Sequence, residues 1–170
     1  PYTVVELAET SDESLLERLS VQVRTGMEGV VRVVNAYCPP ARGAQQGATF
    51  VANELPSSRR DIICGDLNAH SMLWDREQPE DERGGLIEDW LMAQDFGLAN
   101  DGSVTRVNRG TGGGSSPDVT LAHQSQLDKF EWTCLEDMGS DHLPILVEWE
   151  CGLSLVKTAS PALQWRWGKV

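Results

Sequence analysis

The sequence has no apolar run of the ~20 residues that a bilayer-spanning helix needs, so we expect no membrane partner. Its first residues, PYTVVELAET, lack an initiator Met and the charged and apolar regions of a signal peptide. We therefore expect the chain to begin inside a larger polypeptide.

Cysteine is scarce and never paired in sequence: there are four residues, with no C-x-x-C motif. They are Cys38, Cys64, Cys134 and Cys151. This wide spacing argues against a structural zinc site and against a small disulfide framework. We expect buried free thiols, which is the usual state of unpaired cysteine.

Basic residues are outnumbered, 14 against 26 acidic residues, and the formal net charge is -12. A field of this sign opposes a polyanionic partner at long range. The charge is uneven, however, because Arg106 and Arg109 lie in a stretch without acidic residues and the last twenty residues carry only basic charges. A polyanion could therefore still dock locally.

The order of elements predicts one mixed α/β domain over residues 1–150, with 151–170 as a tail or linker. Strand-like runs come first, one or two helices lie between them, and further strands follow. A short helix is expected before Pro56, and a longer helix over residues 84–98 with Gly97 as its C-cap. The Gly-rich segment 110–117 is expected to be a loop. The expected strands are 18–23, 30–37, 61–65, 101–107, 118–123, 129–136 and 143–150.

Three short polar motifs end strands or follow them: GDLN from Gly65, SSPD from Ser115 and GSDH from Gly139. Hydrolysis of a phosphodiester needs a carboxylate or imidazole that deprotonates water, groups that orient the water, and a hard cation with oxygen ligands. The motifs supply suitable groups. These are Asp66, Asn68, Asp118, Asp141 and His142.

Each motif also has a simpler interpretation. An Asp or Asn after a strand is commonly a turn former, and GDLN alone is more often a turn than a site. His70 and His123 have no acidic partner at a suggestive spacing, so we expect both outside the site. His142 differs, because a neighbouring carboxylate could fix its tautomer as catalysis requires. For Arg106 and Arg109, solvated loop side chains are the simpler interpretation and phosphate contacts the alternative.

GDLNAH, SSPDVTLA and GSDHLPI resemble, in order and spacing, the signature blocks of the endonuclease/exonuclease/phosphatase family, and NAYCPP resembles the tyrosine block before them. Within that family, the sequence most resembles the apurinic-endonuclease-like domains of non-LTR retrotransposons, over roughly residues 30–150. The resemblance implies a DNase I-like, four-layer α/β/β/α sandwich of two packed mixed sheets flanked by helices, here without its amino-terminal strands.

The resemblance also implies site residues. Asp66 matches the catalytic aspartate and Asn68 the asparagine that orients the water. We expect these two to share a face, because alternate residues of an extended segment point the same way. Asp118 matches the aspartate that polarises the catalytic histidine, His142. Tyr37 matches the tyrosine at the scissile phosphate. A further match is Asp141, a carboxylate near the divalent ion, which is Mg²⁺ or alternatively Mn²⁺.

The family's amino-terminal Asn block and metal-binding Glu block have no convincing match here, and Glu6 and Glu9 lack the flanking pattern. We therefore expect a truncated domain. The implied function is a metal-dependent DNA endonuclease that nicks target DNA for retrotransposition, in the nucleus, linked to a reverse transcriptase. Two alternatives stay open: another phosphoesterase of the superfamily, acting on abasic DNA, phospholipid or inositol phosphate, and a noncatalytic relic that binds nucleic acid.

Overall fold

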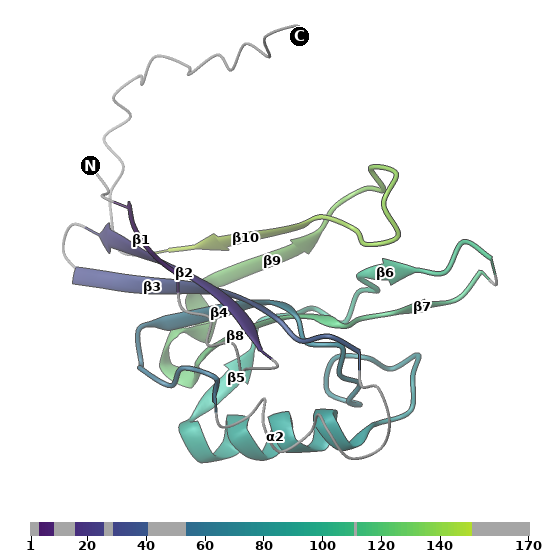
Figure 1. The fold of residues 1–170 in the computed structure, drawn as a ribbon, viewed down its shortest axis with the longest axis horizontal. Coiled ribbons are helices and arrows are strands. Elements are labelled where there is room, and N and C mark those ends of the chain that lie inside the picture. Colours follow the sequence, from purple (N-terminus) through teal and green to yellow (C-terminus); the bar gives the residue numbers. More distant parts are fainter. Residues whose placement is uncertain (1–3, 9–15, 26–28, 41–53, 111, 151–170) are drawn as a thin grey trace, which may run out of the picture.

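The computed structural model describes residues 4–8, 16–25, 29–40, 54–110 and 112–150. Most of its strands form one six-stranded sheet in the order β1-β2-β3-β4-β8-β5 (Figure 1). The pairing of β3 with β4 is parallel and the other four are antiparallel, so the sheet is mixed. The bounds are β1 Val4–Ala8, β2 Glu17–Thr25, β3 Gly29–Tyr37, β4 Asp61–Asp66, β8 Asp118–His123 and β5 Phe96–Leu98.

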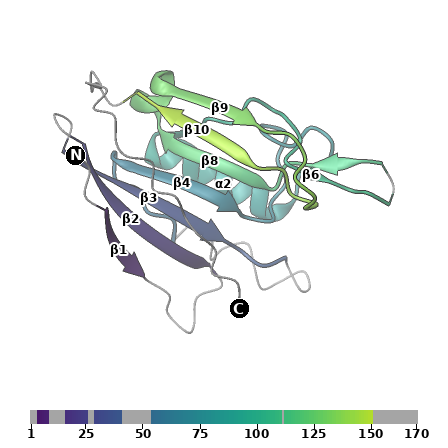
Figure 2. The same cartoon turned by 90° about the horizontal axis from the view of Figure 1, so that it is seen from above.

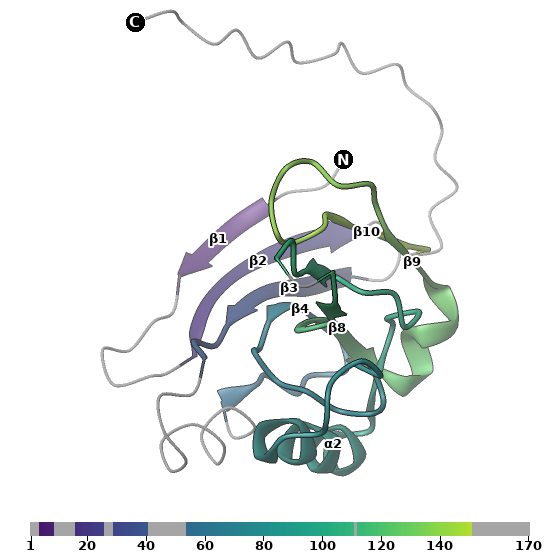
Figure 3. The same cartoon turned by 90° about the vertical axis from the view of Figure 1, so that its right-hand side faces the viewer.

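Helix α2, Glu82–Gln94, covers one face of this sheet (Figure 3). It begins at Asp81, whose side chain accepts a hydrogen bond from the Gly84 N–H, as a helix N-cap does. The helix ends at Asp95 in the left-handed conformation, so the expectation that Gly97 is the C-cap was wrong. An aspartate tolerates this conformation better than most residues, and Gly97 lies instead in β5.

The main core lies between α2 and the sheet. Trp90 and Phe96 pack with ring centroids 4.9 Å apart. β-branched and aliphatic side chains of the central strands complete the cluster, which buries apolar surface on both elements. Its strand members include Val34, Ala36, Ile63, Val119 and Leu121.

Strands β9, Phe130–Cys134, and β10, Ile145–Trp149, pair with each other and cover the opposite face of the six-stranded sheet (Figures 1 and 2). Trp132 of β9 is buried there, and its indole N–H donates to Thr120 of β8. The layers are therefore helix, mixed sheet and a smaller antiparallel sheet, which confirms the expected α/β arrangement of packed sheets. Of the two helical layers expected, the described residues show the one that α2 forms. No helix in the described part of the chain is long and apolar enough to cross a membrane.

The strand expectations are confirmed for 18–23, 30–37, 61–65, 118–123, 129–136 and 143–150. In 101–107 only β6, Arg106–Val107, is a strand. The Gly-rich segment is more ordered than expected, because Gly114–Ser115 forms β7 and pairs with β6. The helix expected before Pro56 falls mostly on residues outside the described ranges, as do Glu9 and the tail 151–170. Glu6 lies in β1, the edge strand of the six-stranded sheet.

Three cysteines are free, as expected: Cys38 is buried, and Cys64 and Cys134 are partly buried. Burial raises the pKa of each of these thiols, which favours the protonated form. Cys151 lies outside the described residues.

Candidate active site

The ends of β3, β4 and β8 meet at one edge of the sheet. Asp66 is the last residue of β4 and faces Asp118, the first residue of β8, as its direct partner across the antiparallel ladder. Directly opposed residues point to the same face, with Cβ atoms ~5 Å apart. The two carboxylates are therefore neighbours because of the strand register.

Gly65 makes the approach of β3 and β4 possible. Its φ is +148°, and a Cβ on this residue would lie 1.9 Å from the carbonyl oxygen of Ala36. One residue beyond β3, the Cys38 N–H donates to the carbonyl of Asp66, the last residue of β4, over 2.9 Å. Any side chain at position 65 would push these two strand ends apart, and Asp66 with them.

Asp118 is joined to His142, which lies 24 positions later in the chain. Nδ1 of His142 is 2.9 Å from Oδ2 of Asp118. The same oxygen accepts a hydrogen bond of 2.6 Å from the hydroxyl of Thr105, which is fully buried. Because an ionised carboxylate only accepts, Asp118 holds His142 with its hydrogen on Nδ1. The other ring nitrogen, Nε2, then carries the lone pair.

That lone pair is directed toward Asp66: Nε2 lies 3.9 Å from Oδ2 of Asp66. Burial raises the pKa of the Asp66 carboxyl, and the charge of Asp118 raises it further. The Asn68 N–H, His142 and Arg106 act in the opposite direction. A water molecule or phosphate oxygen between Asp66 and His142 would be within hydrogen-bonding reach of both.

Backbone pairing positions His142 beside Asp118 and Asp66. Residues 105–107 and 141–143 run antiparallel, with the Val107 N–H donating to the Asp141 carbonyl and the Leu143 N–H to the Thr105 carbonyl. An isolated bridge between Arg106 and His142 lies between these two bonds. The short strand β6 is therefore the support on which the GSDH motif is placed.

Asn68 was expected to share a face with Asp66 because both would lie in an extended segment. This reason was wrong, since Asn68 has φ +44° and the chain turns there. The Asn68 N–H donates to Oδ1 of Asp66 over 2.8 Å, the side-chain turn typical of aspartate. Its amide nitrogen donates to the Cys38 carbonyl. GDLN is therefore both a turn and a part of the candidate site.

Buried Arg83 stabilises this turn through hydrogen bonds to backbone carbonyls. Its Nη1 donates to the carbonyls of Pro39, Leu67 and Asn68 at 3.1, 2.8 and 3.0 Å. The first carbonyl follows β3 and the other two follow β4. One guanidinium therefore ties together the two loops that leave the site.

The other expected site residues lie around this cluster. Tyr37, at the end of β3, is 39% exposed at the same sheet edge. Asp141 is exposed and pairs with Arg106 at 3.0 Å, and this pair lowers the pKa of the Asp141 carboxyl. Arg109 pairs with Asp137 at 2.8 Å. A role in metal or phosphate binding stays a prediction for Asp141 and for both arginines.

Asp66, Asp118 and His142 form a group whose ligand atoms all lie within 4.8 Å of one another. The donor set fits a hard cation, because the carboxylates of Asp66 and Asp118 lie side by side and offer the oxygen ligands that such cations take. Mg²⁺ is commonly held by one or two carboxylates and keeps several waters. Asp66 and Asp118 are the residues that would hold it.

Two features were not expected from the sequence: the contact of Thr105 with Asp118 and the pairing of His70 with Asp75. Thr105 lies 13 positions before Asp118, and no local pattern marks a threonine as the partner of a distant carboxylate. The expectation that His70 has no acidic partner was also wrong, since its Nδ1 lies 2.6 Å from Oδ2 of Asp75. The spacing of five within NAHSMLWD was the available signal. His123 likewise pairs with an acidic residue, Asp95, at 3.4 Å.

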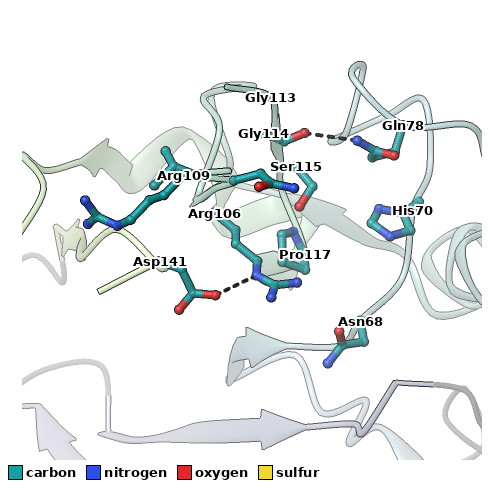
Figure 4. A pocket seen from close by; sticks show the side chains of 12 residues that line it. Asn68, His70, Gln78, Arg106, Arg109, Gly113, Gly114, Ser115, Pro117 and Asp141 are labelled. Carbon is teal, nitrogen blue, oxygen red and sulfur yellow. Dashed lines mark hydrogen bonds and ion pairs between the residues drawn. The ribbon is translucent and has the colours of Figure 1, made fainter. Parts of the chain in front are cut away.

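A cavity of ≈ 440 Å³ opens beside Asn68 (Figure 4). Its walls are the loop that follows β4 and the β6–β7 hairpin, which Gln78 joins by donating to the Gly114 carbonyl. Arg106 and Asp141 lie on one side and His70 on the other. The Asp66, Asp118 and His142 group does not itself line the cavity, but the chain neighbours Pro117 and Asp141 do, so the space for a substrate lies beside this group.

The sequence model of a family described as endonuclease-reverse transcriptase matches residues 31–146. Among solved structures, the endonuclease domain of TRAS1, a telomere-specific non-LTR retrotransposon, is similar with a TM-score of 0.65 and 22% identity, covering 85% of this chain and 66% of that domain. The chain thus spans just under two thirds of that domain.

The 3′-5′ exonuclease NExo from Neisseria meningitidis is similar with a TM-score of 0.58 and 15% identity, covering 86% of this chain and 70% of that one. A variant of the 3′ phosphatase NExo from Neisseria, bound to product DNA hairpin, gives 0.55 and 14%, covering 79% and 65%. These likenesses confirm a DNase I-like fold. No curated protein matches the chain.

Proposed function

The chain belongs to the endonuclease-reverse transcriptase family, and from this membership and the site we infer that it hydrolyses phosphodiester bonds of DNA. The observation that carries the proposal is the Asp118–His142 pair, with Nε2 of the ring directed toward Asp66. A histidine held this way by a carboxylate can take a proton from water at Nε2.

In the proposed reaction, His142 removes a proton from the attacking water at Nε2, and Asp118 stabilises the resulting imidazolium through Nδ1. Asp66 and Asn68 orient the water. Thr105 holds the Asp118 carboxylate so that the ring cannot rotate away. A divalent cation held by Asp66 and Asp118, Mg²⁺ or alternatively Mn²⁺, would supply positive charge against the phosphate.

Positive groups beside the cluster suit the DNA backbone. Arg106 and Arg109 both line the cavity and are about half exposed. Their acidic partners Asp141 and Asp137 are exposed as well, and surface ion pairs of this kind contribute little stability. A DNA phosphate can therefore compete for either guanidinium. We propose that Tyr37, which is exposed at the end of β3, contacts the scissile phosphate.

We further propose that this activity nicks target DNA in the nucleus for retrotransposition, and that a reverse transcriptase is linked to the domain. The family description and the likeness to a retrotransposon endonuclease domain support this proposal. The sequence of the complete polypeptide tests it, because a reverse transcriptase domain after Val170 is expected. A complete polypeptide without one would reject this part of the proposal.

Two kinds of DNA substrate test the activity itself. Supercoiled plasmid has no ends, so only an endonuclease converts it to the open circle. A hairpin with a recessed 3′ end reports exonuclease, and one with a 3′-phosphate reports phosphatase. We expect plasmid nicking that requires a divalent cation. Processing of the hairpins with intact plasmid would assign the chain to a phosphoesterase of another kind, and no reaction with either would reject hydrolysis.

A further inference from the structure

His70 and Asp75 form a second histidine–carboxylate pair, apart from Asp118 and His142. Both lie in the loop between β4 and α2, and Nδ1 of His70 is 2.6 Å from Oδ2 of Asp75. Asp75 is fully buried, whereas 31% of the His70 side chain is exposed. Since Nδ1 faces the buried carboxylate, the exposed edge of the ring is the one that carries Nε2.

The carboxylate of Asp75 is buried and depends on His70 for its side-chain pairing. In the described part of the chain, Oδ1 of Asp75 has no hydrogen-bond partner and His70 is the side chain that pairs with Oδ2. A buried carboxylate is costly unless a positive or donating group compensates it. The arrangement therefore fixes the ring position, with Nδ1 facing Asp75.

The backbone of the loop is also fixed. The Asp81 N–H donates to the His70 carbonyl over 3.0 Å. A Cβ on Gly84 would lie 1.9 Å from this same oxygen, so the first turn of α2 packs directly against it. His70 is thus held at both its backbone and its Nδ1, and only the Nε2 edge of the ring has no hydrogen-bond partner among the described residues.

This edge belongs to the wall of the ≈ 440 Å³ cavity. His70 lies across the cavity from Arg106 and near Asn68 (Figure 4). Two arginines line the cavity, Arg106 and Arg109, with a single carboxylate, Asp141, among the lining residues. Arg106 pairs with Asp141 and Arg109 with Asp137, and both pairs are about half exposed, so a ligand can compete for either guanidinium. The remaining polar side chains are amides and a hydroxyl. This balance of groups suits an anionic ligand.

We propose that His70 binds, as an imidazolium, a DNA phosphate that flanks the bond under attack: Nδ1–H donates to Asp75, the positioning residue that holds the ring, and Nε2–H donates to the phosphate. The proposal rests on the proposed function, because it names a substrate contact of the same site. Asn68 connects the two places: it lines the cavity beside His70, and its backbone N–H bonds Asp66. A strand of DNA that places one phosphate between Asp66 and His142 would continue into this cavity.

The direct test is NMR of the histidine Cε1 protons during titration with a short DNA duplex, in EDTA so that no cleavage occurs. The chain has three histidines, so His123→Gln and His142→Gln identify the His70 signal by elimination. We expect the His70 signal to move on DNA binding. His123 serves as the control, since it pairs with Asp95 at the other end of β8 and should not move.

A second measurement compares the duplex affinity of His70→Gln with that of His123→Gln at several salt concentrations. Loss of one phosphate contact should weaken binding by ~10-fold and lower the salt slope by about one. KM for nicking should rise while kcat changes little, as for lost uniform binding. Thermal unfolding of both variants shows whether His70→Gln remains folded.

The outcomes separate the two proposals. DNA binding with an unmoved His70 signal, or with unchanged affinity and slope in His70→Gln, would overturn the His70 contact and leave the nuclease proposal intact. A moved His70 signal without any cleavage in Mg²⁺ would support the contact and reject hydrolysis. A parent protein that binds no duplex at any salt concentration would reject both.

Discussion

The carboxylate of Asp118 lies 2.9 Å from Nδ1 of His142, although the two residues are 24 positions apart in the chain. The pairing of residues 105–107 with 141–143 brings His142 beside Asp118, and the β4–β8 ladder sets Asp118 opposite Asp66. The geometry of the site is therefore a property of strand register, and substitutions that alter the register or its supports should alter activity.

Thr105→Val tests the hydroxyl that supports Asp118. Valine has nearly the same shape as threonine, but it removes the 2.6 Å bond to Oδ2. A hydrogen bond to a charged group contributes ~1.5–3 kcal/mol, so we expect a loss of ~10- to 100-fold in kcat. Thr133→Val, at an exposed position of β9, is the matched control in steady-state nicking assays. Equal kcat in the two variants would remove Thr105 from the account.

Asp66→Asn should abolish activity and yet stabilise the fold. Burial raises the pKa of Asp66 above its ordinary value of 3.8, so the native state binds this proton more tightly than the unfolded chain. The free energy of unfolding of the parent therefore falls as pH rises from 3.8 through the raised pKa. The advantage of asparagine should appear over this window and reach up to ~1 kcal/mol at neutral pH.

Urea unfolding in EDTA across acidic and neutral pH measures this difference. A variant that is less stable than the parent at neutral pH, or an advantage that grows as the pH falls, would contradict the account of Asp66.

Arg83→Lys should disturb the site through the loops. Lysine keeps the charge, but its side chain is one bond shorter than the path to Nη1, the nitrogen that donates to the Pro39, Leu67 and Asn68 carbonyls. Leaving buried carbonyls without donors costs ~1–3 kcal/mol, so we expect this loss of stability together with reduced kcat. Arg59→Lys is the control, because Arg59 is exposed. Identical denaturation midpoints for the two variants would show that Arg83 does not tie the loops.

Gly65→Ala tests the close approach of β3 and β4. Gly102→Ala is its control: Gly102 also has positive φ, +90°, but nothing lies within 4 Å of its Cβ position. At Gly65 the added methyl would meet the Ala36 carbonyl at 1.9 Å. We expect Gly65→Ala to cost at least ~2 kcal/mol more than Gly102→Ala in chemical denaturation. Similar costs would mean that the strands can separate without penalty.

Much of this arrangement was predictable, because strand periodicity and short motifs are local. The runs at 30–37, 61–65 and 118–123 are apolar and bounded by turn residues, and each forms a strand. The motifs GDLN, SSPD and GSDH were sufficient to select Asp66, Asp118 and His142, which the structure places together. What the sequence does not contain is the register that sets these residues opposite one another.

The wrong expectations, for Asn68, Gly97 and His70, have a common origin in tertiary structure. Asn68 looked extended because its left-handed turn depends on a hydrogen bond from its own N–H to Asp66. Gly97 looked like a helix cap, but Asp95 ends the helix so that β5 can pair with β8. His70 looked unpartnered since the loop that folds Asp75 back onto it has no periodic pattern. Each outcome is set by tertiary contacts.

The most direct test of the central claim is nicking of supercoiled plasmid by the parent, His142→Ala and His123→Ala, each with Mg²⁺ and with EDTA. We predict Mg²⁺-dependent nicking by the parent and by His123→Ala, and a loss of at least ~100-fold in His142→Ala, the low end for a positioned acid or base. Folded His142→Ala that nicks at the parental rate would contradict the assignment of His142 as the proton acceptor of the site.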